Sequence, residues 1–482
     1  MTCSPAQPVA PVSASVSVDT RAEPDRAALE ALLPRYDTAG PRYTSYPTAP
    51  TWREEPDAQT YRASLAALPG SGPYAIYVHV PFCRSLCHFC ACNRVITRKA
   101  EPPAHYLKHL AREIKEVRRA LPDRARAGQI HLGGGTPTHL TPPQLEALMG
   151  ELTRSFPATE DAEISIEIDP RVTTAAHMDV LLAWGFNRLS LGIQDFDPLV
   201  QAAIHRRQSV DQVARLVERV RAGEPCGINF DLIYGLPHQN EESFSRTLEH
   251  VISLRPDRIA LYGYAHVTWV ARHQRGFERL DLPSAKARLG LQLLAIERLT
   301  ESGYVAIGMD HFALPDDELA RAAKERRLHR NFMGYTIRTC SESLAFGPSG
   351  ISEFSSGFVQ SQRDLHDWET GIKAAGLAPF RAHRSSEDDK RRAWVISQIM
   401  CHGAVSGEAY RSLYGESFRD RFASELTRLK RLEDDGLLAL EPDGSFEMSA
   451  SGRLFLRNAA MAFDAYLPGQ KDRDCGMFSR TV

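Results

Sequence analysis

A short apolar strand that runs directly into four cysteines sets the architecture of this chain: Tyr77-Val-His-Val-Pro-Phe-Cys83-Arg-Ser-Leu-Cys87-His-Phe-Cys90-Ala-Cys92. Ala75–Val80 contains the β-branched and aromatic residues that are typical of a strand. The chain has nine cysteines in all, and an odd number with four crowded into ten positions does not indicate a disulfide framework. We therefore interpret the four cysteines as a metal-binding loop in a cytoplasmic protein.

Five further strand-like runs follow, and the segments between them have helical spacing. The six predicted strands are Ala75–Val80, Ile130–Leu132, Glu163–Ile168, Asn187–Leu191, Ile228–Ile233 and Arg258–Tyr262. Strands that alternate with helices predict an α/β fold with a parallel sheet. Six repeats fit a partial (βα)6 barrel, similar to a TIM barrel, better than a complete eight-fold one.

Polar or small residues follow or close each predicted strand. They are Cys83, Gly133, Glu167, Gln194, Asp231 and Ala265 with His266. The carboxyl ends of parallel barrel strands open on one face, so these residues are expected to converge at a single mouth. The third strand also alternates strictly, with acidic and serine residues on one face and isoleucines on the other, which indicates a polar lumen.

The predicted organisation has four parts: a flexible tail over residues 1–24, an N-terminal segment over 25–73, the barrel over 74–310 and a C-terminal domain over 311–482. The C-terminal domain is mainly helical and resembles a winged-helix unit. Its predicted helices are Ala285–Glu301 (at the end of the barrel), Asp389–Met400, Phe418–Leu432 and Gly452–Phe463, with a hairpin of Leu437–Leu440 and Phe446–Ser449.

Composition excludes several classes of partner. The 58 basic and 60 acidic side chains give a net charge of -2. A protein that binds nucleic acid needs an excess of Lys and Arg on one face to neutralise the phosphates, so we expect no nucleic-acid partner. The predicted wing is acidic, which also argues against DNA binding. The chain has no apolar run of the roughly 18–20 residues that a membrane span requires, so we expect no membrane partner.

The cysteine spacing can be compared with that of zinc sites, inert buried cysteines and iron–sulfur clusters. Structural zinc sites usually pair two separated Cys-x-x-Cys knuckles, and inert buried cysteines seldom crowd together. The run does not match that of ferredoxins either. One residue between Cys90 and Cys92 makes it hard for both thiols to reach different corners of a cubane. We therefore expect Cys83, Cys87 and Cys90 to hold three irons, which leaves Cys92 unbound and one iron open.

The Cys-x3-Cys-x2-Cys spacing of Cys83, Cys87 and Cys90 resembles the defining loop of the radical S-adenosylmethionine (SAM) superfamily. The resemblance implies a [4Fe–4S] cluster whose open iron is chelated by the amino and carboxylate groups of SAM. It further implies that the reduced cluster cleaves SAM into methionine and a 5′-deoxyadenosyl radical. A barrel that shields the cluster from water and oxygen is compatible with this chemistry.

The same resemblance assigns cofactor contacts, one or two SAM molecules being expected. The residues implied to hold the cluster-bound SAM are Tyr77, Gly134, Glu167 and Ile351. The residues implied around a second SAM are Phe89, Gly135, Thr136, Gln194, Arg206, Asp231 and Ala265. Taken singly, such residues are more often turn caps or surface ion pairs. Their shared placement after strands favours a site.

Longer segments are similar to the oxygen-independent coproporphyrinogen III oxidase family. They include Arg42-Tyr-Thr-Ser-Tyr-Pro-Thr48, Gly308-Met-Asp-His-Phe312, Asn331-Phe-Met-Gly-Tyr-Thr336 and Phe478-Ser-Arg-Thr-Val482. The family implies an oxidoreductase of haem biosynthesis that converts two propionates of coproporphyrinogen III to vinyl groups, giving protoporphyrinogen IX and carbon dioxide. It also implies that the C-terminal domain covers the substrate and that residues 25–73 pack near the active site.

The implied reaction sets further expectations. The tetra-anionic substrate requires Arg or His partners, and the candidates are Arg42, His311 and Arg330. Cys92 is the other candidate catalytic residue. Loss of carbon dioxide from the substrate radical leaves one electron to remove, so the reaction needs an external terminal acceptor in addition to a low-potential electron donor. We expect a monomer.

Two positions depart from the pattern of this family. Ala91 stands where relatives usually have glycine, and Pro348 fixes φ just before Ile351, which places that contact in question. Two alternatives stay open at this point. One is a haem-binding or haem-trafficking relative without oxidase activity, and the other is a closed electron-transfer cluster with Cys92 as its fourth ligand.

Overall fold

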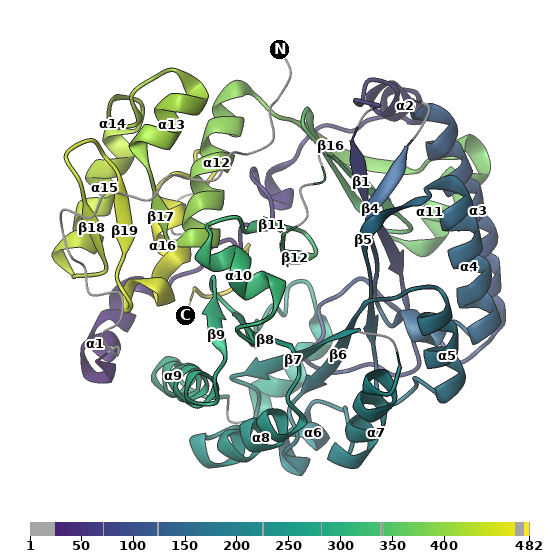
Figure 1. The fold of residues 1–482 in the computed structure, drawn as a ribbon, viewed down its shortest axis with the longest axis horizontal. Helices are drawn as coiled ribbons and strands as arrows, with labels where there is room; N and C mark the ends of the chain where they lie inside the picture. The colour runs from purple at the N-terminus through teal and green to yellow at the C-terminus, as the bar shows by residue number, and fades with distance from the viewer. Residues whose placement is uncertain are drawn as a thin grey trace.

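The computed structural model describes residues 25–481, apart from residues 71, 123–124, 224–225, 281, 338–339, 341 and 468–476. The tail expected over residues 1–24 lies outside this part of the chain. The described residues form a sheet that is curled into an open barrel, with a helical unit beside it (Figure 1). None of the described helices is both long enough and apolar enough to cross a membrane.

All six predicted strands are present and lie side by side in chain order. They are β1 (Pro73–Val80), β4 (Arg126–Gly134), β5 (Ala158–Ile168), β6 (Arg188–Gln194), β7 (Gly227–Tyr234) and β8 (Arg258–Gly263). Each neighbouring pair is parallel. The predicted partial barrel is therefore confirmed, and the carboxyl ends of its strands meet at one end.

The two faces of the sheet differ in polarity. On β5, Ile164, Ile166 and Ile168 are buried in the main apolar core, whereas the residues between them are polar. The helices that cover the outer face are α3 (Glu101–Ala120), α4 (Pro142–Ser155), α5 (Ala175–Ala183), α7 (Val210–Arg221) and α8 (Glu241–Leu254) (Figure 1). Burial of apolar side chains between strands and helices stabilises the barrel and leaves the polar side chains for the lumen.

The sheet continues at both edges, where the sequence predicts no strands. Beside β8 it adds the antiparallel strands β10 (His311–Ala313) and β9 (Val305–Ile307). Beside β1 it adds β13 (Glu342–Phe346), β14 (Ile351–Phe354), β15 (Gly357–Ser361) and β16 (Pro379–Arg384). The boundary expected between residues 310 and 311 is thus not a break in the sheet, because later strands pair with both edges of the barrel and cover backbone groups that would otherwise be unpaired.

The C-terminal unit contains the predicted helices and hairpin. Its helices are α12 (Glu387–His402), α13 (Gly407–Tyr414), α14 (Phe418–Arg421), α15 (Ala423–Asp434) and α16 (Leu456–Met461). β18 (Leu438–Leu440) and β19 (Phe446–Met448) form the hairpin, and β17 (Ala404–Val405) adds a third strand. The helix predicted over Phe418–Leu432 is interrupted at Phe422, whose ring is fully buried.

The N-terminal segment joins the barrel to the C-terminal unit. α1 (Arg26–Tyr36) packs against α9 (Ala285–Glu301), and α2 (Ala58–Ala66) packs against α3. Arg457 of the C-terminal unit donates to the backbone carbonyls of Gly40 and Pro41. Between the two parts lie α10 (Glu318–Lys324) and the hairpin of β11 (His329–Asn331) and β12 (Gly334–Thr336) (Figure 1).

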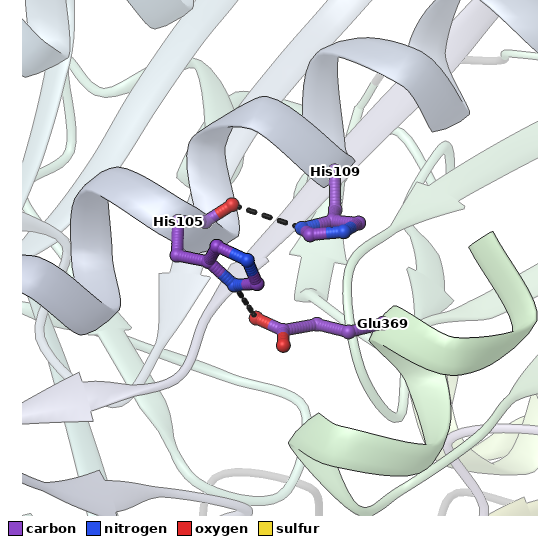
Figure 2. A group of neighbouring side chains, drawn as sticks. All are labelled: His105, His109 and Glu369. Carbon is purple, nitrogen blue, oxygen red and sulfur yellow. Dashed lines mark hydrogen bonds and ion pairs between the residues drawn. The ribbon is translucent and has the colours of Figure 1, made fainter. Parts of the chain in front are cut away.

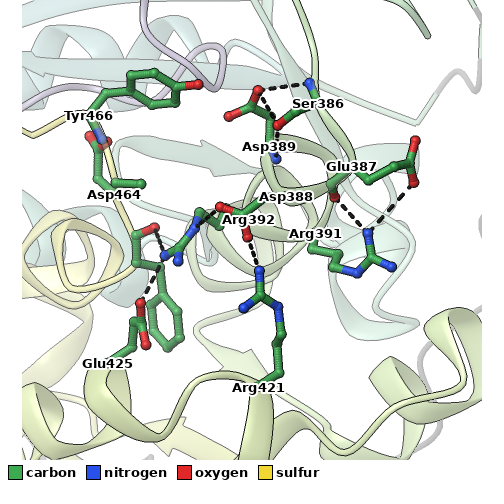
Figure 3. A network of polar contacts seen from close by, with 12 residues as sticks. Ser386, Glu387, Asp388, Asp389, Arg391, Arg392, Arg421, Glu425, Asp464 and Tyr466 are labelled. Carbon is green, nitrogen blue, oxygen red and sulfur yellow. Dashed lines mark hydrogen bonds and ion pairs between the residues drawn. The ribbon is translucent and has the colours of Figure 1, made fainter.

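An ionic network holds the start of α12 against α15 (Figure 3). Arg392 Nε lies 2.8 Å from Asp388 Oδ2, and Arg392 Nη1 lies 3.0 Å from Glu425 Oε1. The same Nη1 donates to Phe463 O at 3.0 Å. The side chains of Arg392 and Glu425 are only 12% and 7% exposed, so removal of one leaves the other charge poorly hydrated.

We expect Arg392→Ala to lower the free energy of unfolding of the C-terminal unit by about 2–4 kcal/mol, because Glu425 loses a buried partner. Arg421→Ala is the matched control. Arg421 pairs with Asp388 from a side chain that is 36% exposed, so its loss should cost less than about 1 kcal/mol. Urea unfolding, followed by circular dichroism, measures the free energy of unfolding of both variants. Equal losses of this free energy would show that the buried ion pair of Arg392 is no more stabilising than the exposed one of Arg421.

Candidate active site

A cavity of about 370 Å³ extends through the barrel lumen to the cysteine loop. Its walls come from β4, β5, β6, β7 and β8, and residues of β10, β11 and β12 contribute to its lining. The predicted site residues that line it are Cys83, Cys87, Phe89, Cys90, Cys92, Gly134, Gly135, Thr136, Glu167, Gln194, Arg206, Asp231 and His311. Residues that are far apart in the sequence therefore meet where the parallel strands end.

The cysteine loop is anchored at both ends and in the middle. The short strand β2 (Phe82–Cys83) enters the loop and pairs in parallel with β3 (Val95–Ile96), which leaves it. Within the loop, His88 N donates to Ile204 O at 2.9 Å, next to α6 (Pro198–Ala203). These backbone hydrogen bonds fix the path of the loop across the mouth of the cavity.

Two arginines approach the thiol of Cys87. Arg171 Nη2 lies 3.4 Å and Arg206 Nη1 lies 3.7 Å from Cys87 Sγ. Both arginines also pair with Asp169, at 2.6 and 3.1 Å. Burial opposes ionisation of Asp169, but the charges of Arg206 and Arg171 hold its pKa at about 2. The wall beside Cys87 therefore carries two cations against one carboxylate, which stabilises a thiolate or another anionic group.

The last two cysteines of the loop share a proton unequally. A hydrogen bond with Cys92 lowers the pKa of Cys90 to about 6, and the same contact raises the pKa of Cys92. This order is consistent with a cluster held by Cys83, Cys87 and Cys90, with Cys92 as a neighbouring hydrogen-bond donor.

The glycines at the end of β4 bring the backbone close to the cavity. Gly134 has φ +112°, and a Cβ there would lie 2.8 Å from the ring of His79. Gly134 N donates to Glu167 Oε2 at 3.2 Å, which ties this turn to β5. Three thiols, N–H donors on the sulfur of Cys87 and glycine backbone in the cavity lining fit a [4Fe–4S] cluster with a small ligand beside it.

Deeper in the lumen, polar side chains bond to one another across the strands. Gln129 Nε2 donates to Glu163 Oε1 at 3.0 Å, and Ser190 Oγ donates to Asp231 Oδ2 at 2.9 Å. Burial, together with the nearby charge of Glu167, raises the pKa of Asp231 to about 6. The ionised carboxylate of Asp231 therefore destabilises the folded protein. Groups with pKa values shifted in this way are common at ligand-binding and catalytic sites.

This destabilisation predicts a pH-dependent gain in stability for Asp231→Asn. The folded-state pKa lies above the ordinary value near 4, so the unfolded chain loses this proton first as pH rises. Wild-type stability then falls by about 1–3 kcal/mol between pH 4 and pH 6. Cofactor-free Asp231→Asn should have a higher Tm than wild type at pH 7 and an equal Tm near pH 4. A gain of the same size at both pH values would contradict this explanation.

Five predicted site residues lie outside the cavity lining: Tyr77, Ala265, Ile351, Arg42 and Arg330. Tyr77 stacks on His131, which does line the cavity. Ala265 O accepts a hydrogen bond from Gln274 Nε2 at 3.3 Å, and Ile351 lies at the start of β14.

Arg42 and Arg330 lie directly behind the cavity wall. Arg42 is stacked over the ring of Tyr262 at 5.9 Å, and Arg330 over the ring of Tyr335 at 5.1 Å. Both tyrosines line the cavity. Arg330 Nη1 donates to Arg42 O at 2.8 Å, whereas its buried Nε has no hydrogen-bond partner among the described residues.

Sequence reasoning missed several residues of this site, among them Arg171 and His131, which contact predicted site residues. Arg171, which contacts Cys87, follows Asp169 by two positions at the end of β5. His131 lines the cavity from β4, where it bonds to Ser165 at 2.8 Å and lies 3.5 Å from Glu167. The signal for His131 was its alternation with Gln129 on one strand, which is the same criterion that identified the polar face of β5.

Comparison with known proteins gives matches over nearly the whole chain. The sequence pattern of the Radical SAM superfamily matches residues 77–251. The oxygen-independent coproporphyrinogen III oxidase of Pseudomonas aeruginosa is 42% identical, over 94% of this chain and 98% of that protein. The enzyme of the same name from Escherichia coli is 41% identical, over 94% and 98%.

A solved structure shows the same similarity in three dimensions. It is that of coproporphyrinogen III oxidase from Escherichia coli, described as a radical SAM enzyme, and it superposes with a TM-score of 0.86 at 39% identity. The match covers 91% of this chain and 99% of the other. The shared region therefore includes both the barrel and the C-terminal unit.

Proposed function

This chain belongs to the oxygen-independent coproporphyrinogen III oxidase family of the radical SAM superfamily, and from this premise we propose that it oxidatively decarboxylates coproporphyrinogen III. Two propionate side chains become vinyl groups, giving protoporphyrinogen IX in haem biosynthesis. The observation that carries the proposal is the placement of Cys83, Cys87 and Cys90 at the mouth of one polar cavity. The similarity to oxygen-independent coproporphyrinogen III oxidases over nearly the whole chain does not favour a haem-binding or haem-trafficking relative.

The residues at the mouth have distinct proposed roles. Cys83, Cys87 and Cys90 hold three irons of the cluster, and Cys92 remains a hydrogen-bond donor to Cys90. When bound, the [4Fe–4S] cluster and SAM supply the one-electron chemistry that removes a hydrogen atom from the substrate. The carboxylate of Glu167, held beside Gly134, is an anionic partner for the ammonium group of SAM.

The four carboxylates of the substrate require cations at the other end of the cavity. His311 lines the cavity, and its Nδ1 lies 2.7 Å from Asp310 Oδ1, which fixes the ring. Arg42 and Arg330 are the other proposed partners. Their positions against Tyr262 and Tyr335, which both line the cavity, support this role.

Further parts of the proposal concern the surroundings of the reaction. An external low-potential donor reduces the cluster, and a terminal acceptor takes the electron that remains after each carbon dioxide is lost. Residues 311–482 cover the substrate, which is supported by Asn331, Met333 and Tyr335 in the cavity lining. Free thiols at Cys83, Cys87, Cys90, Cys92, Cys226 and Cys401 support a reducing, cytoplasmic location. We propose that the protein acts as a monomer.

Anaerobic incubation with reductant, SAM, an electron acceptor and coproporphyrinogen III tests the function. We expect protoporphyrinogen IX, with two carbon dioxides and 5′-deoxyadenosine released. Stoichiometric binding of haem without turnover would instead support the trafficking relative. Heat-treated protein and omission of SAM are the controls.

A further inference from the structure

A second group of metal-ligand side chains lies outside the cavity, between α3 and α11 (Leu365–Ala375). It consists of His105 and His109, one helical turn apart on α3, and Glu369 on α11 (Figure 2). One ligand atom from each residue lies within 4.8 Å of those from the other two. Residues i and i+4 share a face of a helix, so both imidazoles are directed toward the same neighbouring helix.

The hydrogen bonds leave these groups ready to coordinate. His109 Nδ1 donates to the backbone carbonyl of His105 at 3.0 Å, so the lone pair of the neutral ring is on Nε2. That nitrogen makes no hydrogen bond within the part of the chain that the structure describes. His105 Nδ1 lies 3.0 Å from Glu369 Oε1, close to the separation of about 3.3 Å between two ligand atoms of a tetrahedral zinc ion.

The burial of the group is that of a partly enclosed site. His109 is buried, with its ring against Trp368, whereas the side chains of His105 and Glu369 are 44% and 14% exposed. Two imidazoles and one carboxylate are a donor set for borderline divalent ions, and the exposed side leaves room for a water ligand. An ion there would replace the proton that lies between His105 and Glu369.

We propose that His105, His109 and Glu369 bind one divalent transition-metal ion of the Zn²⁺ type, which fastens α11 to α3. α3 follows the cysteine loop, and α11 connects β15 with β16 at the edge of the sheet. The ion therefore braces the C-terminal strands against the barrel. This site does not depend on the proposed function, because none of its three residues lines the cavity.

The test is a titration of cluster-loaded protein, kept oxygen-free, with Zn²⁺ alone. Calorimetry should show one Zn²⁺ per chain that binds at least about tenfold more weakly in His105→Asn and in Glu369→Gln. Asp367→Asn, an exposed carboxylate on the same helix, and His250→Asn, an exposed histidine on α8, should bind Zn²⁺ like wild type. Zn²⁺ should also raise the Tm of wild type by about 2–4 °C but not that of the two ligand variants.

Several outcomes separate the proposal from non-specific binding. Mg²⁺ should give neither heat nor a shift in Tm, because imidazole is a poor ligand for it. The iron content of the same samples is measured, because zinc that binds to the cysteine loop instead would displace iron. The proposal is overturned if wild type binds no Zn²⁺ beyond what displaces iron, or if the ligand variants match it in affinity and Tm.

Discussion

Cys90→Ala should lose its iron, from about four atoms per chain to background, and with it all 5′-deoxyadenosine production. Cys90 lines the cavity together with Cys83 and Cys87 and completes the Cys-x3-Cys-x2-Cys spacing of the loop. Cys92→Ala should keep its iron, because Cys92 lies outside the Cys-x3-Cys-x2-Cys set that holds three irons, but should lose oxidase activity. Iron analysis, absorbance and product quantification after anaerobic reconstitution measure both variants.

Cys226→Ala is the matched control, because Cys226 lies outside the cavity lining and its loss removes a thiol without touching the loop. This variant should keep wild-type iron and activity. A closed electron-transfer cluster predicts a different result, in which Cys92→Ala loses iron as completely as Cys90→Ala. That result would remove the open coordination position on which the proposed function depends.

Gly135→Ala should lower activity by at least about 100-fold, because a displacement of roughly 1 Å at a reacting centre has this cost. A Cβ on residue 135 would lie 2.8 Å from the backbone carbonyl of Pro81 and 2.9 Å from that of Phe82. Backbone atoms cannot move aside as a flexible side chain does, so the chain leading into Cys83 must shift. Iron content per chain and the rate of 5′-deoxyadenosine formation report the displacement.

Gly150→Ala is the control for Gly135→Ala. Gly150 lies within α4, and the nearest atoms to a Cβ there are at 3.7 Å, which is ordinary van der Waals contact. This variant should be as active as wild type and at least as stable, because alanine favours a helix interior. If Gly135→Ala were equally active, the close approach of the turn to the strand before the loop would have no bearing on the chemistry.

The barrel was predictable because each strand can be recognised from its own short stretch of sequence. Each of the six strands carries its own β-branched composition, and the polar alternation of Glu163, Ser165 and Glu167 identified the lumen face without any knowledge of its neighbours. The edge strands β13–β16 were not predictable in this way. They are short, and β13 (Glu342–Phe346) is placed by pairing in parallel with β1, more than 250 residues earlier in the chain.

The site was predictable to a similar extent and for a similar reason. Residues that end a parallel strand were expected to meet at the mouth, and Glu167 and Gln194 both line the cavity, whereas Ala265 does not. Arg171 was missed because it lies beyond its strand, in a turn, and its contact with Cys87 depends on how that turn folds back. Arg42 was identified from a motif, and only the structure places it behind Tyr262.

Electron paramagnetic resonance of the reduced, cluster-loaded protein, recorded before and after addition of SAM, tests the central claim most directly. The signal should belong to a [4Fe–4S] cluster and should change when SAM is added, in wild type and in Cys92→Ala alike, because an iron without a protein ligand is free to bind it. A spectrum that SAM leaves unchanged, from a cluster that disappears in Cys92→Ala, would contradict the account.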